Sequence, residues 1–220
     1  MNIVITGASS GVGFEAVLEL IQKNDNRIIA LARSEDKLQR LLDIATSLNP
    51  DCSLYPVKFD IVHDDYVASL VPFVRSRLES VDVLINNAGS LINKPFEDLA
   101  QLDFAEMLQN NLLGHVKMIQ HLLPLMKAGS HILNIGSMGG FQGSIKFPGL
   151  AAYSASKAAL HTLTECLALG SAQTEMLEKA FPDYESPVMA YEMGKYIADF
   201  ALTGHKFFNG KILPVAVTTP

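Results

Sequence analysis

The chain has 220 residues and a net charge of −6, with 49% hydrophobic and 18% charged residues. This length suits a single domain over residues 1–220, the composition excludes an intrinsically disordered chain, and two isolated cysteines exclude a disulfide framework. An acidic chain without Lys/Arg clusters, a signal peptide or a long apolar run indicates no nucleic-acid or membrane partner, and we predict a cytoplasmic protein.

Short apolar runs alternate with amphipathic segments along the chain. The continuous β-branched run Asn2–Thr6 is typical of a strand covered on both faces. Further strands are expected at Arg27–Ala32, Ser53–Phe59, Val81–Asn86, His131–Gly136 and Ile212–Val217. Helices are expected at Gly11–Lys23, Glu35–Ser47, Asp64–Glu79, twice within Asp98–Met126, at Ala151–Cys166 and at Val188–Leu202. This alternation predicts a doubly wound, Rossmann-like α/β fold, a mostly seven-stranded parallel sheet with helices on both faces.

A glycine-rich turn follows the first predicted strand, where ligands bind in such sheets. Gly7, Gly11 and Gly13 lie in this turn, with Ser9, Ser10 and Val12 between them. Glycines let the backbone approach a pyrophosphate, which would then lie at a helix N-terminus. The turn therefore favours phosphate binding, and a plain glycine turn at a helix start is the alternative.

Charged residues follow the second and third predicted strands. Arg33 is placed to neutralise a 2′-phosphate and so favours NADP(H) over NAD(H), and a solvated surface residue at a helix start is the less favoured alternative. Asp60 is placed to accept a hydrogen bond from an adenine amino group. An aspartate at this position could also cap the next helix, and the sequence leaves both interpretations of Asp60 open.

Small and polar residues follow the fourth and fifth predicted strands. Asn87, Ala88 and Gly89 suit close packing and hydrogen bonding beside a ligand. Ser137 places a hydroxyl in the glycine-rich segment that begins at Gly136. A serine in such a segment is by itself more often a surface residue than a functional one.

Tyr153 and Lys157 are separated by four positions in a predicted helix. Residues at this spacing lie on one helix face within reach of each other. A free tyrosine is a weak acid, and a nearby ammonium stabilises its phenolate, which suits proton exchange with an alcohol or a carbonyl. An isolated pair of this kind is more often a core tyrosine beside a lysine that extends to water.

Three motifs in this order resemble the short-chain dehydrogenase/reductase family over nearly the whole chain. TGASSGVG matches the family pattern TGxxxGxG, NNAG is identical, and YSASK matches YxxxK. The resemblance implies that Tyr153 is the general acid/base, that Lys157 assists it and holds the nicotinamide ribose, and that Ser137 hydrogen-bonds the substrate carbonyl. It also implies that Asn111 supports a water relay to the lysine, chosen over Asn110 by the family spacing N-x-x-G.

The resemblance also implies a set of cofactor and partner contacts. The cofactor-binding residues would be Gly7, Ser9, Ser10, Gly11, Val12, Gly13, Arg33, Asp60, Ile61, Asn87, Ala88, Gly89, Tyr153 and Lys157. NADP(H) is favoured because Ala32 stands where NAD-preferring members carry Asp, but Ser10 stands where NADP-preferring members often carry a basic residue. A small carbonyl or alcohol substrate and a homodimer or homotetramer are expected, with no metal.

The sequence departs from the family pattern after Lys157. The segment from Leu169 to Thr174 resembles the family's Pro-Gly-x-x-x-Thr element and implies cofactor contacts at Ala172 and Thr174. Only 13 positions separate Lys157 from Gly170, roughly 14 fewer than a helix and its return to a parallel strand need. Either a stretch is missing from the sequence near 164–167, which we favour, or a real deletion shortens the helix.

Two functions from different classes follow from this pattern. The first is an NADP(H)-dependent oxidoreductase that interconverts a carbonyl and an alcohol, with a substrate lid at Glu175–Pro187 unless that segment is a plain loop. The second is a catalytically inactive relative that binds NADP(H) as a sensor or scaffold. The complete Ser137, Tyr153 and Lys157 set favours the enzyme, because a sensor needs no acid–base group.

Overall fold

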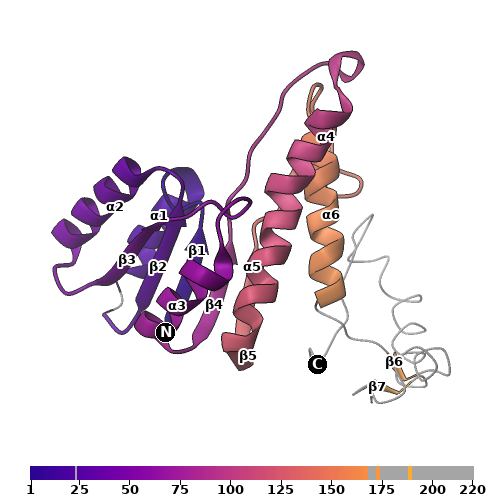
Figure 1. Ribbon diagram of the computed structural model, residues 1–220. Helices are drawn as coiled ribbons and strands as arrows, with labels where there is room; N and C mark the ends of the chain where they lie inside the picture. The colour runs from indigo at the N-terminus through magenta and orange to yellow at the C-terminus, as the bar shows by residue number, and fades with distance from the viewer. Residues whose placement is uncertain (23, 168–171, 174–187, 190–220) are drawn as a thin grey trace, which may run out of the picture. The chain divides into compact units, whose positions relative to one another are not determined.

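The computed structural model describes residues 1–22, 24–167, 172–173 and 188–189 (Figure 1). Its contacts divide the chain into two compact units, Met1–Leu160 and His161–Pro220. Among the described residues, no helix combines the length and the apolar character that crossing a bilayer requires. The elements that position the candidate site all lie in the first unit.

The first unit is built on a parallel sheet with the strand order β3-β2-β1-β4-β5. The strands are β1 (Asn2–Thr6), β2 (Arg27–Ala32), β3 (Ser53–Lys58), β4 (Val81–Asn86) and β5 (Met126–Asn134). The chain adds β2 and β3 on one side of β1, and then returns to add β4 and β5 on the other side. The connections that leave β1 and β4 therefore diverge, and a crevice opens between them at the C-terminal ends of the strands.

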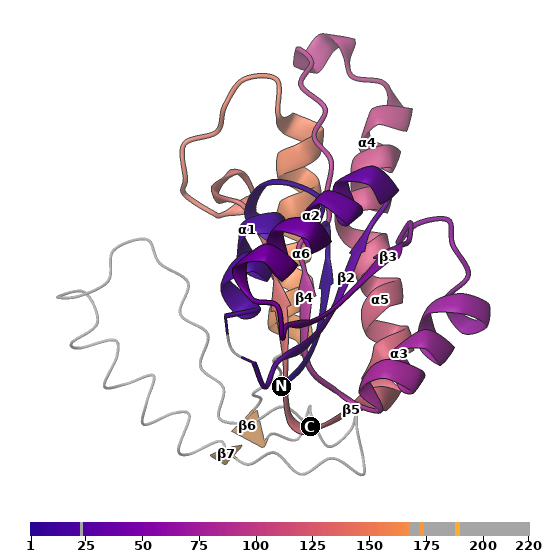
Figure 2. The ribbon, with the colours of Figure 1, turned by 90° about the vertical axis from the view of Figure 1, so that its left-hand side faces the viewer.

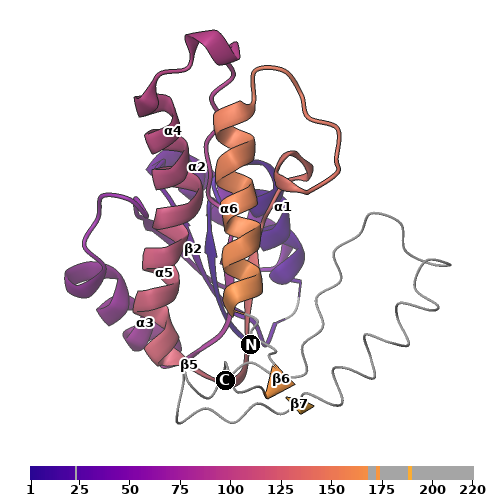
Figure 3. The same ribbon diagram turned by 90° about the vertical axis from the view of Figure 1, so that its right-hand side faces the viewer.

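Helices cover both faces of this sheet. On one face lie α1 (Gly11–Leu20) and α2 (Glu35–Leu48), which are nearest the viewer in Figure 2. On the other face lie α3 (Val71–Leu78), α4 (Gln101–Leu108), α5 (Gly114–Leu122) and the part of α6 (Ala151–Leu167) that belongs to the first unit, as Figure 3 shows. This two-sided arrangement is the predicted doubly wound fold.

The core lies on both faces because side chains alternate along each strand. In β1, Val4 faces the layer of α3 and α5, whereas Ile3 and Ile5 face the layer of α1 and α2. In β2, Ile29 and Ile28 divide between the two layers in the same way. Burial on both faces explains why these strands are continuous apolar runs in the sequence.

Two predicted helical regions contain segments of π-helix. The region predicted as one helix from Asp64 begins with a π-helical turn, η1 (Tyr66–Leu70), before α3. The Asp65 side chain caps it by accepting hydrogen bonds from the amides of Val67 and Ala68. The region predicted as two helices is α4 and α5 joined by a second π-segment, η3 (Gln109–Leu113), and followed by the 3₁₀ turn Leu123–Leu125.

Some predicted elements differ from the structure in number or extent. The main sheet has five strands within the described residues, and the further strands of the predicted seven fall in a part of the chain that is largely outside them. The strands β6 (Ala172–Gln173) and β7 (Val188–Met189) pair with each other in a separate two-stranded sheet. The helix expected from Val188 is therefore wrong at its first two residues, where strand pairing prevails over the helical pattern. The strand expected at Ile212–Val217 lies outside the described residues.

The length anomaly after Lys157 remains a prediction. The structure follows α6 as a continuous helix through Thr164 to Leu167. Residues 168–171, where the return to a strand was expected, lie outside the described residues, as does the predicted lid Glu175–Pro187. The expected single domain over residues 1–220 also stays a prediction.

Candidate active site

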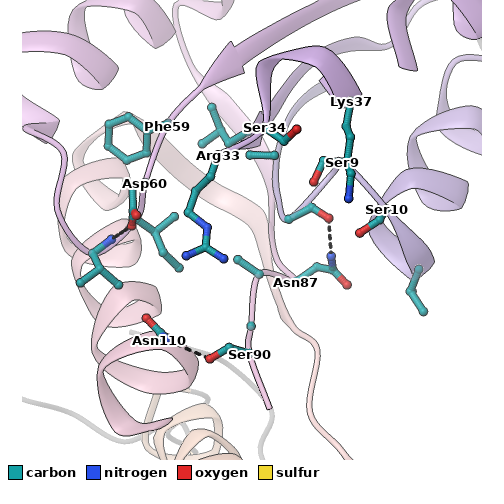
Figure 4. Close-up of a pocket in the computed structure, with 18 residues that line it drawn as sticks. Ser9, Ser10, Arg33, Ser34, Lys37, Phe59, Asp60, Asn87, Ser90 and Asn110 are labelled. Atoms are coloured by element: carbon teal, nitrogen blue, oxygen red, sulfur yellow. Dashed lines mark hydrogen bonds between the residues drawn. The ribbon is translucent and has the colours of Figure 1, made fainter. Parts of the chain in front are cut away.

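A cavity of about 610 Å³ opens at the C-terminal ends of β1, β2, β3 and β4 (Figure 4). The predicted cofactor residues on its wall are Gly7, Ser9, Ser10, Val12, Arg33, Asp60, Ile61, Asn87, Ala88 and Gly89. Further wall residues that the sequence did not single out include Ser34, Lys37, Phe59, Ser90 and Asn110. The crevice expected from the strand order is therefore lined by predicted cofactor residues.

The glycine turn is shaped by contact with the end of β4. Gly7 has a φ of +68°, and a Cβ atom there would lie 2.7 Å from the Cα atom of Ala88. A Cβ atom on Gly13 would lie 2.5 Å from the carbonyl oxygen of Gly7. Gly11, with a φ of +58°, has open space around it. Gly11 and Gly13 are not on the cavity wall, so they shape the turn and do not line the site.

Hydrogen bonds join the end of β1 to the end of β4. The Thr6 hydroxyl accepts hydrogen bonds from the backbone amides of Asn87 and Ala88, each at 3.0 Å. The Asn87 side-chain amide donates to the carbonyl oxygens of Thr6 and Gly7, each at 3.1 Å. These bonds hold the two diverging loops at a defined separation, and the cavity floor is consequently preorganised.

Arg33 and Asp60 both lie on the cavity wall. One carboxylate oxygen of Asp60 accepts a 2.9 Å hydrogen bond from the backbone amide of Val62. The amide of Asp60 itself donates to the side chain of Asp64 at 2.7 Å. The helix cap is Asp65 and not Asp60, so Asp60 closes a local turn while it faces the cavity.

Lys157 is held in the interior beside the end of β5. Its side chain is only 4% exposed, and its ammonium donates a 2.8 Å hydrogen bond to the carbonyl oxygen of Ile135. Burial lowers the pKa of Lys157 from its usual value, because the charged form loses hydration. The ammonium is therefore a fixed positive charge one turn along α6 from Tyr153.

Gly139 lies next to both the Ser137 hydroxyl and the Tyr153 ring. A Cβ atom on Gly139 would lie 3.3 Å from Ser137 Oγ, 3.0 Å from Ser154 Oγ and 3.8 Å from Tyr153 Cε1. The Ser137 hydroxyl accepts a 3.0 Å hydrogen bond from the Gly139 amide. The fold thus brings the predicted hydroxyl and the predicted acid/base group together, from two different elements.

The next residue, Gly140, sets how closely this loop approaches α6. A Cβ atom on Gly140 would lie 2.5 Å from the backbone nitrogen of Ala158 and 2.6 Å from the backbone carbon of Lys157. Both atoms belong to the helix backbone and cannot move aside. Only glycine lets the Ser137 loop pack directly on the helix turn that carries Lys157.

Asn111 is buried within a network between the β4 loop and α6. It is 0% exposed, and its Oδ1 accepts a 2.8 Å hydrogen bond from the Ser90 amide. Its Nδ2 donates at 3.0 Å both to the Ser90 carbonyl and to Ser156 Oγ. Asn110 instead lines the cavity and donates to Ser90 Oγ at 2.9 Å. The Asn111 side chain therefore positions Ser90 and Ser156.

His115 is a buried residue of this region that the sequence analysis did not identify. It is 0% exposed, and its Nε2 lies 2.7 Å from the carbonyl oxygen of Ala88. Burial and, to a lesser extent, the nearby positive charge of Lys157 lower the pKa of His115 to about 4, although the hydrogen bond to the Ala88 carbonyl acts to raise it. The imidazole is therefore neutral near pH 7. A carbonyl oxygen can only accept a hydrogen bond. His115 Nε2 therefore carries the hydrogen and donates it to the Ala88 carbonyl.

Two predicted cofactor residues lie beyond the first unit. Ala172 is the first residue of β6, and Thr174 lies outside the described residues. Within the described residues, no three His, Cys, Asp or Glu side chains are grouped in a way that could hold a metal ion.

The strand order, the glycine turn and the crevice define a Rossmann-like nucleotide-binding protein. The family described as short chain dehydrogenase matches residues 1–177 of the chain. The chain therefore belongs to the short-chain dehydrogenase/reductase family, and it is an oxidoreductase of that family. An uncharacterized oxidoreductase of Staphylococcus aureus (strain MW2) is 31% identical over 173 residues, which cover 78% of this chain and 71% of that protein.

Solved structures share the fold. A 7α-hydroxysteroid dehydrogenase complexed with NADH and 7-oxo glycochenodeoxycholic acid has a TM-score of 0.66 and 28% identity. L-sorbose reductase from Gluconobacter frateurii, complexed with NADPH and L-sorbose, has a TM-score of 0.68 and 25% identity. Each match covers 76% of this chain, and 64% and 62% of the respective solved chains.

Proposed function

We propose that this protein interconverts a carbonyl group and an alcohol in a small molecule, with NADP(H) as the favoured cofactor. The observation that carries the proposal is that the Ser137 hydroxyl and the Tyr153 ring both lie next to Gly139. A hydroxyl donor and an acid/base group that lie close to each other are what the reduction of a carbonyl requires.

The residues present fit a nicotinamide dinucleotide. Because Gly7 has no Cβ atom, the backbone of the turn can lie directly against Ala88. Ser10, at the start of α1, makes no capping hydrogen bond with its side chain, so its hydroxyl is available to a pyrophosphate at the helix N-terminus. When bound, the nicotinamide cofactor supplies or accepts the hydride. Gly7, Ser9, Ser10 and Val12, together with residues 60–61 and 87–89, would hold its pyrophosphate and adenosine parts.

The chain's own residues supply the proton transfer and the orientation. Ser137 would hydrogen-bond the substrate oxygen and orient it toward Tyr153. The Tyr153 hydroxyl would donate its proton to that oxygen in reduction and accept it in oxidation. Lys157, whose ammonium is fixed by the Ile135 carbonyl, would stabilise the negative charge left on the tyrosine oxygen. Asn111 would keep Ser90 and Ser156 in place.

The preference for NADP(H) rests on the end of β2. Arg33 lies on the cavity wall, and the residue before it is Ala32 rather than a carboxylate. A guanidinium at this position favours a 2′-phosphate, whereas a carboxylate would repel it. The two solved relatives were obtained with NADH and with NADPH, so the fold accommodates either cofactor and the local charge decides the preference.

The experiment is a screen of NADPH oxidation with a panel of aldehydes and ketones, using the wild type and Tyr153→Phe. Loss of turnover in Tyr153→Phe, with NADP⁺ binding retained, supports the proposal. Tyr55→Phe is the matched control, because Tyr55 lies on β3 away from the cavity wall. Turnover retained in Tyr153→Phe would refute the assigned acid/base. Wild-type binding of NADP(H) without turnover on any carbonyl would favour the sensor instead.

We also propose that the protein self-associates through the helices around η3. Large apolar side chains are exposed there, among them Leu102 at 80%, Leu113 at 44% and Leu123 at 54%. An exposed apolar surface of this kind is typical of an interface. Light scattering coupled to size exclusion would report a dimer or tetramer, and Leu102→Glu would shift it toward the monomer. A monomeric wild type at micromolar concentration would contradict this proposal.

A further inference from the structure

Two cations on the cavity wall have no ion-pair partner among the described residues. Arg33 and Lys37 line the cavity, and neither belongs to the ion pairs of the described residues, which are Lys58–Glu35 and Lys94–Asp103. The acidic residue on the same wall is Asp60, and one of its oxygens is already bonded to the Val62 amide. This end of the cavity therefore carries positive charge that no ion pair of the described residues neutralises.

Lys37 extends from α2 toward the glycine turn. Figure 4 shows its ammonium end directed toward the segment that carries Ser9 and Ser10. The Arg33 guanidinium lies to the left of that segment in the same view, on the side of Asp60. Lys37 is in the first turn of α2, where the helix dipole disfavours a cation. Lys37 consequently does not stabilise its own helix, and its charge is available to an anion in the cavity.

Two serine hydroxyls beside these cations are also uncommitted. Ser34 and Ser10 are the N-cap residues of α2 and α1, and neither side chain makes a capping hydrogen bond. An N-cap serine normally accepts a hydrogen bond from its helix. Both hydroxyls line the cavity. They can therefore donate to the oxygens of a ligand between the two helix N-termini.

The acidic residues of the first turn of α2 do not oppose an anion inside the cavity. Glu35 and Asp36 occupy that turn, but neither lines the cavity. Glu35 instead lies 3.9 Å from the Lys58 ammonium, and both side chains are exposed. Ala32, which does line the cavity, carries no charge. The wall next to Arg33 and Lys37 is consequently free of carboxylates up to Asp60.

We propose that Lys37 determines specificity for the cofactor's 2′-phosphate, which it binds together with Arg33. It supplies from α2 the positive charge that Ser10 does not supply in the glycine turn. Arg33 presents a planar fork of donors and Lys37 a compact charge with three donors, so the phosphate would be held from two sides. This inference rests on the proposed use of NADP(H).

The test compares the dissociation constants of NADP⁺ and NAD⁺, by calorimetric titration, for the wild type and Lys37→Gln. Loss of one charge-assisted hydrogen bond predicts at least about a tenfold weaker binding of NADP⁺, with NAD⁺ changed less than about twofold. Lys37→Arg should restore most of the affinity. Arg40→Gln is the matched control, because Arg40 is exposed on the same helix and is not on the cavity wall.

The outcomes separate this inference from the proposed function. If the wild type prefers NADP⁺ and Lys37→Gln keeps that preference, the role of Lys37 is overturned while the proposed cofactor stands. If the wild type binds NAD⁺ as tightly as NADP⁺, both the cofactor preference and the role of Lys37 are overturned. Equal weakening of both cofactors in Lys37→Gln would also overturn specificity for the 2′-phosphate.

Discussion

The Lys157 ammonium donates a 2.8 Å hydrogen bond to the carbonyl oxygen of Ile135, the residue that follows β5. This bond ties the middle of α6 to the C-terminal edge of the sheet. It holds a positive charge in a position that is 4% exposed, and the desolvation of that charge costs stability. The arrangement indicates that Lys157 is kept for its charge and not for its packing.

Lys157→Met should therefore separate activity from stability. We expect turnover to fall by about a hundredfold or more, because the tyrosine loses the charge that stabilises its phenolate. The free energy of unfolding should stay within about 1 kcal/mol of wild type, since methionine fills a similar volume without a buried charge. Steady-state kinetics and urea denaturation measure the two quantities. A large loss of stability with an equal loss of activity would indicate a purely structural lysine.

Gly140→Ala should destabilise the protein more than Gly139→Ala. The new methyl group at 140 would meet helix backbone at 2.5 Å, whereas at 139 it would meet serine hydroxyls that can rotate. We expect a loss of about 2 kcal/mol or more for Gly140→Ala, as for other overpacked sites. Thermal and urea unfolding of both variants check this. Equal stabilities would show that the loop can move away from α6.

Asn111 and Asn110 should differ sharply although they are neighbours. Asn111→Ala leaves the Ser90 amide and carbonyl without their buried partner, and we expect a loss of roughly 2–3 kcal/mol in unfolding free energy. Asn110→Ala removes one hydrogen bond to Ser90 Oγ and should cost about 1 kcal/mol or less. Chemical denaturation of both variants measures the difference. The reverse order would contradict the positioning role of Asn111.

His115 should make the protein less stable in mild acid. Its pKa of about 4 in the folded protein is below the ordinary value of 6.5, so the unfolded chain binds the proton first. The contribution is fully present above about pH 6.5 and is lost as the pH falls toward 4, by up to roughly 3 kcal/mol. Urea unfolding between pH 4 and 7 measures this, and His115→Gln should flatten the slope. An unchanged slope in that variant would assign the acid sensitivity to other groups.

Local sequence patterns were sufficient to locate the strands of the main sheet. The β-branched run Asn2–Thr6 and the segment Arg27–Ala32 were predicted with the bounds that the structure has, because burial on both faces demands apolar residues at every position. The glycine turn could also be predicted from neighbouring residues alone, because a positive φ and a close backbone approach both require glycine. The family motifs then assigned roles to Ser137, Tyr153 and Lys157, and these roles remain proposals.

Only the tertiary structure decided which other residues accompany these motifs. Lys37 and His115 carry no distinctive local pattern, and each gains its significance from a segment far away in the chain, the glycine turn for Lys37 and Ala88 for His115. The same holds for Asn110 and Asn111, where the register of the π-segment η3 sends one side chain to the cavity and buries the other. Sequence determined the elements and the chemistry they carry, because these depend on neighbouring residues. Long-range packing determined where the charges and unpaired groups meet, because those distances exist only in the folded chain.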